Sequence, residues 1–297
     1  MLKSRKLKIL AAVALVLIMA WLAVSAFVAW RLTRRGSGPL VEQPPVVAGD
    51  YVEAIRLKTC DDQQIGGWLK RGDADKPCVL LLHGIKGSRG QMLPVMEWLA
   101  ESRFTVLAIS LRSHGDSTGE VNDIGWSARH DVVAAVAFLR KEFPKRPVFI
   151  DGRSMGAATA IFAAEELKTD VAGYFLEQPY KDLKSAVWAR LQNHLPPILD
   201  WVAYCGMRLW APVFLQADPN QISPYDHIAA IPPSVPGVII TGSADHLDDV
   251  KAMADRVQSG AKLVVFEGAK HEPLYRRDSK LYRDSLMQLL RSRRPSP

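Results

Sequence analysis

Short apolar runs alternate with longer stretches of helical character over most of this 297-residue chain. Apolar runs of about four to eight residues between turns are typical of strands buried on both faces, and amphipathic stretches of about a dozen residues are typical of the helices that connect parallel strands. The alternation therefore predicts βαβ units, which form a mostly parallel sheet flanked by helices. The expected strands are 78–82, 104–110, 148–151, 171–176, 237–241 and 262–266, and the expected helices are 91–102, 126–143, 157–168, 248–258 and 279–291.

Two segments depart from this alternation. Residues 51–60 and 63–70 have the pattern of a hairpin that turns at Asp61 and Asp62, which makes the sheet mixed. Residues 179–235 are rich in aromatic side chains and prolines, and we expect them to form a small helical cap over a pocket, with helices near 187–195 and 197–215. The remainder of 51–292 has the length of a single α/β domain.

The N-terminus carries an apolar run from Ile9 to Trp30 in which Ser25 is the one polar side chain. As a helix this run is about 33 Å long, enough to cross the roughly 30 Å hydrocarbon layer of a bilayer. A signal peptide cleaved near residues 24–26 is the alternative, but the run is longer than such peptides need and ends at a basic stop. We expect a basic N-terminus over 1–8, a transmembrane helix over 9–30 and a linker over 31–50.

The net charge of +7 comes from the basic residues on both sides of this run. Without those seven, 31 basic and 31 acidic residues remain, so we expect no nucleic-acid partner. Slightly more positive charge precedes the run than follows it, which favours a single pass with the C-terminal domain on the extracytoplasmic side. Residues 293–297 are expected to be a disordered tail.

Three cysteines, Cys60, Cys78 and Cys205, lack the spacing of metal ligands. We expect neither a metal nor another cofactor. Cys60 and Cys78 fall on strands predicted to be neighbours, and a disulfide between them is left open.

The motif Gly152-Arg153-Ser154-Met155-Gly156 lies between the predicted strand 148–151 and an alanine-rich helix. A sharp strand-to-helix turn projects a serine hydroxyl above a sheet, and it needs glycines where a side chain would collide. The N-terminus of the following helix also stabilises negative charge that develops beside the serine. This context predicts that Ser154 is a nucleophile and that Gly152 and Gly156 are the glycines of the turn.

A serine hydroxyl needs a general base, and the base needs an acid to fix its tautomer. Asp245 follows one late predicted strand and His271 follows the next, which gives the chain order Ser, Asp, His expected of such a turn in an α/β sheet. Among the seven histidines, His271 alone combines a loop after a strand, an upstream aspartate and a preceding glycine-containing turn. Asp245 is the predicted acid, and Asp248 and Asp249 are the alternatives.

Attack of the serine on a carbonyl creates an oxyanion, which needs two preorganised donors. The backbone N–H of Met155 is one candidate. The other is the N–H of Ile85, in the loop that follows the predicted strand 78–82. His83 begins this loop, and we favour a structural role for it over contact with substrate.

Together these pieces resemble the abhydrolase-domain serine hydrolases, in particular the membrane-anchored Bem46-like and serine-aminopeptidase-like proteins. The resemblance extends over roughly 51–291 and implies an eight-stranded α/β-hydrolase sheet that hydrolyses esters, thioesters or amides without a cofactor. Its matching pieces are His83-Gly84 with Gly87-Ser88, the loop 112–117, the turn around Ser154, Ser223-Pro224, and the segments that carry Asp245 and His271.

One loop departs from the pattern of this family. The chain has Ser113-His114-Gly115 where such relatives often have Arg-Gly-x-Gly. His114 is therefore a candidate for contact with substrate, although a role in packing or in the turn is the favoured interpretation.

Three functions remain open from the sequence. The leading hypothesis is a membrane-anchored hydrolase of esters or thioesters with a lipid-like acyl substrate, because the anchor keeps the site near a bilayer and the cap offers an apolar lining. A serine peptidase or amidase would use the same three residues. A non-catalytic, membrane-bound interaction module is the third hypothesis, and the complete set of catalytic residue types argues against it.

Overall fold

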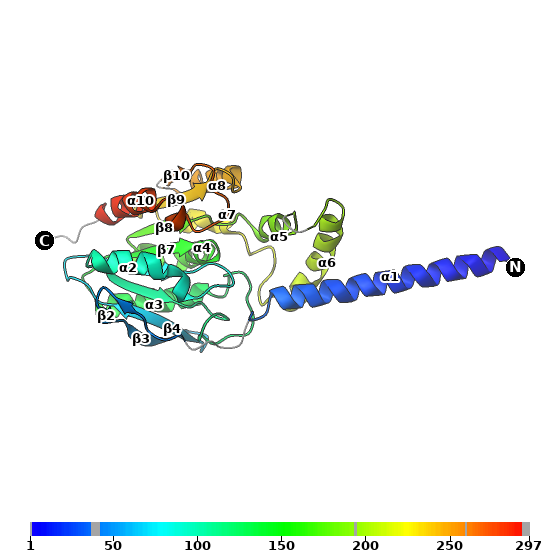
Figure 1. Cartoon of the computed structure of the whole chain (residues 1–297), viewed down its shortest axis with the longest axis horizontal. Helices are drawn as coiled ribbons and strands as arrows, with labels where there is room; N and C mark the ends of the chain where they lie inside the picture. Colours follow the sequence, from blue (N-terminus) through cyan, green and yellow to red (C-terminus); the bar gives the residue numbers. More distant parts are fainter. Residues whose placement is uncertain (1, 37–41, 193–194, 259, 293–297) are drawn as a thin grey trace.

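An eight-stranded sheet forms the centre of the computed structural model, which describes residues 2–36, 42–192, 195–258 and 260–292. The strand order is β10-β9-β8-β7-β5-β6-β4-β3, with β4 antiparallel to both of its neighbours and every other pair parallel (Figure 1). The α/β-hydrolase fold expected from the sequence is confirmed. The strands are β3 (Glu53–Lys58), β4 (Gln64–Lys70), β5 (Cys78–Leu82), β6 (Thr105–Ile109), β7 (Val148–Arg153), β8 (Gly173–Glu177), β9 (Gly237–Gly242) and β10 (Lys262–Phe266).

Helices cover both faces of this sheet. One apolar cluster joins α3 (Arg129–Glu142), α4 (Met155–Leu167) and α8 (Leu247–Ala254) to one face, and a second joins α2 (Leu93–Glu101) and α10 (Ser279–Arg291) to the other. Because both faces are covered, every side chain of β5 is buried, which explains why its sequence is a continuous apolar run.

The order of strands in the sheet corrects the prediction about the cysteines. Cys60 follows β3 and Cys78 begins β5, but β4 and β6 lie between these two strands. The prediction of neighbouring strands is wrong, because β6 inserts beside β4 although it comes later in the chain. All three cysteines are free.

The long N-terminal helix α1 (Leu2–Leu32) projects from the domain (Figure 1). Its segment Arg5–Leu32 is long and apolar enough to cross a membrane by length and composition. The expected cap contains α5 (Leu183–Gln192), α6 (Leu199–Phe214) and the short α7 (Pro224–His227). Helix α6 packs against the C-terminal half of α1, a contact that the sequence did not predict.

The segment expected to be a linker is folded onto the domain in its described parts. Arg34 forms an isolated antiparallel bridge with Val121. The strands β1 (Val46–Val47) and β2 (Asp50–Tyr51) pair with each other, and Val47 is buried. Residues 37–41 of the expected linker and the expected tail at 293–297 lie outside the described residues.

Candidate active site

Ser154 stands alone in the turn between β7, which ends at Arg153, and α4, which begins at Met155. Its backbone has φ 51° and ψ −110°, a conformation that side chains disfavour and that is typical of strained functional turns. A Cβ at Gly156 would lie 2.5 Å from the carbonyl oxygen of Leu82, and one at Gly152 would lie 2.7 Å from the backbone of Gly156. Both positions therefore require glycine.

The structure brings Ser154, His271 and Asp245 together, although they follow three different strands. Ser154 Oγ lies 2.9 Å from His271 Nε2, and His271 Nδ1 lies 2.9 Å from Asp245 Oδ2. A carboxylate can only accept a hydrogen bond, so Nδ1 carries the proton and Nε2 of the neutral ring accepts from the serine hydroxyl. A hydroxyl held in this way can lose its proton as it attacks a carbonyl carbon.

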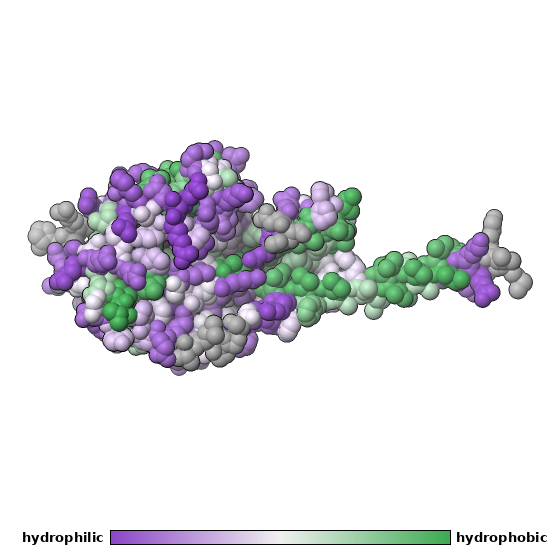
Figure 2. Space-filling view, viewed as in Figure 1, coloured by the Kyte–Doolittle hydropathy of each residue, from purple (hydrophilic) through white to green (hydrophobic). Residues whose placement is uncertain are grey.

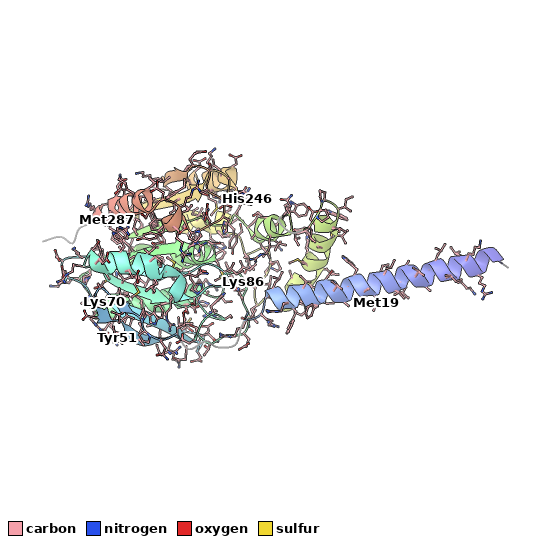
Figure 3. All side chains as sticks on the ribbon, viewed as in Figure 1. Met19, Tyr51, Lys70, Lys86, His246 and Met287 are labelled. Carbon is pink, nitrogen blue, oxygen red and sulfur yellow. The ribbon has the colours of Figure 1, made fainter. Side chains whose placement is uncertain are left out.

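The alternative acids, Asp248 and Asp249, and the neighbouring His246 are not part of this hydrogen-bonded group. Asp248 is almost fully exposed and pairs with Lys251, whereas Asp249 pairs with Lys181. His246 is exposed at the N-terminus of α8, and Figure 3 labels it at the surface of the molecule.

The loop that carries His271 is fixed on both sides by the end of β8. The side chain of Gln178 donates from Nε2 to the carbonyl oxygen of Lys270 at 2.7 Å, and Glu177 Oε1 accepts from the N–H of Leu274 at 2.8 Å. Sequence reasoning missed both residues. Their one signal in the sequence is that two polar residues directly follow the predicted apolar strand 171–176.

Two buried carboxyl groups lie beneath this region. Burial raises the pKa of Glu177 to about 7, although Arg153 and the Leu274 N–H lower it in part. Burial and the neighbouring Glu177 raise the pKa of Asp151 well above its ordinary value. Asp151 Oδ2 accepts a 2.8 Å hydrogen bond from the Tyr282 hydroxyl on α10. These shifts favour neutral carboxyl groups below the site.

The two predicted oxyanion donors belong to the start of α4 and to the loop after β5. Met155 is the first residue of α4, where a backbone N–H has no acceptor within its own helix. Ile85 follows Gly84, where an added Cβ would lie 3.6 Å from Ser154 Cβ. The loop after β5 therefore passes directly beside the serine.

Two buried histidines support that loop instead of facing solvent. His83 is fully buried, accepts at Nε2 from the N–H of Leu111 at 3.0 Å and donates from Nδ1 to the carbonyl oxygen of Gly84 at 2.7 Å. Burial and the neighbouring His114 lower the pKa of His83 to about 3. His114 packs edge-on against it, with ring centroids 5.0 Å apart. Their burial favours the structural role for both residues.

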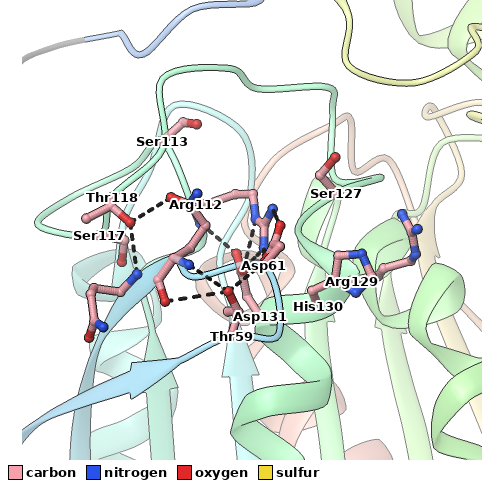
Figure 4. A network of polar contacts seen from close by, with 12 residues as sticks. Thr59, Asp61, Arg112, Ser113, Ser117, Thr118, Ser127, Arg129, His130 and Asp131 are labelled. Carbon is pink, nitrogen blue, oxygen red and sulfur yellow. Dashed lines mark hydrogen bonds and ion pairs between the residues drawn. The ribbon is translucent and has the colours of Figure 1, made fainter.

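An ion-pair network centred on the buried Arg112 holds the loop that carries His114 (Figure 4). Arg112 Nη1 binds Asp61 Oδ2 at 2.6 Å in the β3–β4 turn, and Arg112 Nε binds Asp131 Oδ1 at 2.9 Å on α3. The hydrogen bond from Arg112 lowers the pKa of Asp61 well below its ordinary value. The sequence analysis placed Arg112 in the loop 112–117 that resembles the family, but it did not predict these ion pairs, because burial of an arginine cannot be seen in an apolar pattern. Within the described part of the chain, no group of three or more His, Cys, Asp or Glu side chains is placed to hold a metal ion.

The sequence model of the family described as "Serine aminopeptidase, S33" matches residues 73–228, more than half of the chain. This chain belongs to that family of α/β-hydrolases. The matched range includes Ser154 and the loop after β5, and it ends before Asp245 and His271.

Curated relatives match this family member over part of their length. It is 32% identical to monoglyceride lipase of Rattus norvegicus over 133 residues, which are 43% of the chain and 44% of the relative. It is 34% identical to the human monoglyceride lipase over 134 residues, with the same coverage. An uncharacterized membrane protein of Saccharomyces cerevisiae is 23% identical over 144 residues, 48% of the chain and 51% of that protein. The chain thus spans about half the length of the curated relatives that it matches.

Solved structures share the fold over most of the chain. The esterase Pf2001 of Pyrococcus furiosus is 24% identical, with a TM-score of 0.67 that covers 87% of this chain and 100% of the esterase. An esterase of Exiguobacterium antarcticum is 14% identical, with a TM-score of 0.60 over 80% of this chain and 100% of that one. At these identities the likeness shows the fold alone.

Proposed function

We propose that this chain is a membrane-anchored serine hydrolase that cleaves a carboxylic ester or thioester with a lipid-like acyl group. Ser154 acts as nucleophile, His271 as general base and Asp245 as the acid that orients the base. The observation that carries the proposal is the continuous hydrogen-bonded path from the Ser154 hydroxyl through both ring nitrogens of His271 to Asp245.

The reaction follows from this geometry. Ser154 Oγ attacks the acyl carbon while His271 Nε2 takes its proton, and the N–H groups of Met155 and Ile85 stabilise the oxyanion. His271 then returns the proton to the departing alcohol or thiol, which leaves an acyl-serine. A water molecule, activated by the same imidazole, hydrolyses this intermediate and releases the carboxylic acid.

The preference for an ester rests on the relatives. Two of them are named monoglyceride lipases, and the family description names a peptidase. Acyl transfer to serine is common to both activities. An amidase or peptidase is therefore the second candidate, supported by the family description.

The proposed anchor is α1, with a single pass and the catalytic domain on the extracytoplasmic side. Its retention is supported by contacts that a cleaved signal peptide would not need. The indole N–H of Trp21 donates to the carbonyl oxygen of Val202, and the indole N–H of Trp210 donates to the carbonyl oxygen of Leu22 at 3.1 Å. Both contacts join the part of α1 that precedes the candidate cleavage site to helix α6.

A fluorophosphonate probe tests the catalytic role directly, because it reacts with an activated serine. We expect labelling of the full-length wild type in detergent and no labelling of Ser154→Ala. Ser279→Ala is the matched control, since Ser279 is exposed at the start of α10, and it should label like the wild type. Absence of labelling in folded wild type would remove the proposal.

Substrate class needs a second experiment. A panel of acyl esters of graded chain length beside aminoacyl amides separates the two candidates by kcat/KM. We expect medium or long acyl esters to be preferred. Higher kcat/KM for the aminoacyl amides would instead identify a peptidase.

A further inference from the structure

Helix α6 of the cap has one face that packs on α1, at positions four residues apart. The carbonyl oxygen of Val202 accepts from the Trp21 indole at 3.2 Å, and the Trp210 indole donates to the carbonyl oxygen of Leu22 at 3.1 Å. Between them, Gly206 packs so closely on Ser25 that an added Cβ would overlap its hydroxyl. The one polar side chain of the apolar run is thus buried against a glycine of the cap.

The adjacent face of α6 is apolar and exposed. Trp201, Leu209 and Val213 lie along this face at spacings of four or eight residues, and each is more than half exposed. Ile198 and Leu199 extend it at the start of the helix. Figure 2 shows apolar surface both on the cap and along α1. A contiguous exposed apolar surface of this kind marks an interaction site.

The depth of the contact identifies what covers this face. From Ile9, the run that can cross a bilayer places Trp21 about 18 Å along its axis and Ser25 about 24 Å along it, at a rise of about 1.5 Å per residue. Both positions fall in the second half of a roughly 30 Å hydrocarbon layer. Helix α6 crosses α1 steeply in Figure 1, so it extends along the plane of a membrane that α1 crosses.

We infer that α6 is an interfacial helix that lies in the leaflet nearer the catalytic domain, with Trp201, Leu209 and Val213 in contact with lipid. The inference rests on the proposed anchor and adds a second membrane contact to it. The indole hydrogen bonds between α1 and α6 fit this setting, because polar N–H groups in lipid need partners within the protein.

The position of the cap connects this membrane contact to the active site. Leu215 and Ile222, which follow α6, form an apolar cluster with Ala158 and Phe162 of α4. Helix α4 begins at the residue after Ser154. The segment that we place in lipid therefore connects to residues that pack on α4, the helix that follows the proposed nucleophile. A lipid-like ester in that leaflet would contact the cap before it reached bulk water.

Spin labels in proteoliposomes test this placement without any assay of activity. The full-length chain with Cys60→Ser and Cys205→Ala receives one new cysteine at a time: Leu209→Cys on α6, Val13→Cys on α1, or Glu97→Cys on α2 as the aqueous control. Collisions with oxygen report lipid, and collisions with a charged nickel complex report water. We expect the oxygen-to-nickel ratio at 209 and at 13 to exceed that at 97 by about tenfold, because charge is excluded from hydrocarbon.

The outcomes separate the two proposals. An aqueous signal at 209 beside a lipid signal at 13 overturns the docking of α6 and leaves the anchor standing. Aqueous signals at both overturn anchor and docking together. Lipid signals at both support the docking even if no substrate is ever hydrolysed.

A kinetic experiment tests the connection to the site. We expect Leu209→Glu with Val213→Glu to lower hydrolysis of a long-chain monoacyl ester in vesicles by about tenfold, because carboxylates are costly in lipid. Hydrolysis of a water-soluble butyrate ester should not change. Leu209→Met with Val213→Ile keeps the face apolar and should match the wild type on both substrates. Equal loss on both substrates would overturn a membrane-specific role.

Discussion

Asp245 Oδ2 accepts from His271 Nδ1 at 2.9 Å, whereas Asp248, three residues further on, extends into solvent and pairs with Lys251. Asp245→Asn should lower kcat on an ester by about 10³- to 10⁴-fold, because an amide fails to hold the imidazole in its productive tautomer. Asp248→Asn is the matched control and should retain full activity. Comparable losses in the two variants, with circular dichroism unchanged, would contradict the assignment of Asp245.

The turn at Ser154 leaves no room for a methyl group at Gly156. Gly156→Ala should lower the free energy of unfolding by about 1 to 3 kcal/mol, because its Cβ would press on the carbonyl oxygen of Leu82. At Gly237 the nearest atom to an added Cβ is 3.7 Å away, so Gly237→Ala should be nearly neutral. Thermal unfolding of both variants checks the difference, and equal Tm values would count against the close packing of the turn.

The ion pairs of Arg112 predict a large effect on stability at residues outside the proposed catalytic triad. Arg112→Met should destabilise the domain by about 3 to 5 kcal/mol, because it leaves the buried carboxylate of Asp131 without its partner. Arg103 pairs with Asp73 at the surface, and Arg103→Met should cost at most about 1 kcal/mol. Urea unfolding of the two variants measures both values. Similar midpoints would show that the network contributes no more than a surface pair.

Glu177 predicts a specific dependence of stability on pH. Its pKa is about 7 when folded and near 4.5 in an unfolded chain, so between these values the folded state binds more protons. The free energy of unfolding therefore falls as pH rises from about 4.5 to 7, by up to about 3 kcal/mol from this group. Glu177→Gln keeps an acceptor for the Leu274 N–H and removes the titration.

The test for Glu177 is the difference in Tm between variant and wild type from pH 5 to 8. We expect that difference to shift in favour of Glu177→Gln as pH rises. Comparing the two proteins cancels the contributions of the groups that they share, which include the nearby Arg153 and Asp151. A constant difference would show that Glu177 ionises at its ordinary pH.

The central strands of the sheet could be predicted because they are buried on both faces, so that β5 and β9 appear in the sequence as the same apolar runs that the structure contains. The start of α10 could also be predicted from the sequence, because Asp278 is an N-terminal cap that accepts from the Leu281 N–H at 2.9 Å. Ser154, Asp245 and His271 each follow a predicted strand, so the meeting of parallel strand ends at one edge was enough to group them.

The remaining features depend on contacts between distant segments. Glu177 and Gln178 support the His271 loop through backbone atoms, which carry no residue-specific signal in the partner segment. The packing of Gly206 on Ser25 joins residues 181 positions apart, and neither is distinctive alone. Pattern and propensity describe local preference and burial, whereas such pairs are set by tertiary packing.

Arg35 holds the end of α1 in a fixed orientation relative to the α/β domain. Its guanidinium donates to the carbonyl oxygens of Gly115, Ser117 and Gly119, and its own N–H donates to that of Glu120 at 2.9 Å. A domain on a flexible linker would adopt many orientations relative to α1. These hydrogen bonds instead couple the direction of the helix axis to the loop beside His114. Any change in the tilt of α1 must therefore rotate the α/β domain with it, so Ser154 keeps one orientation relative to the axis of that helix.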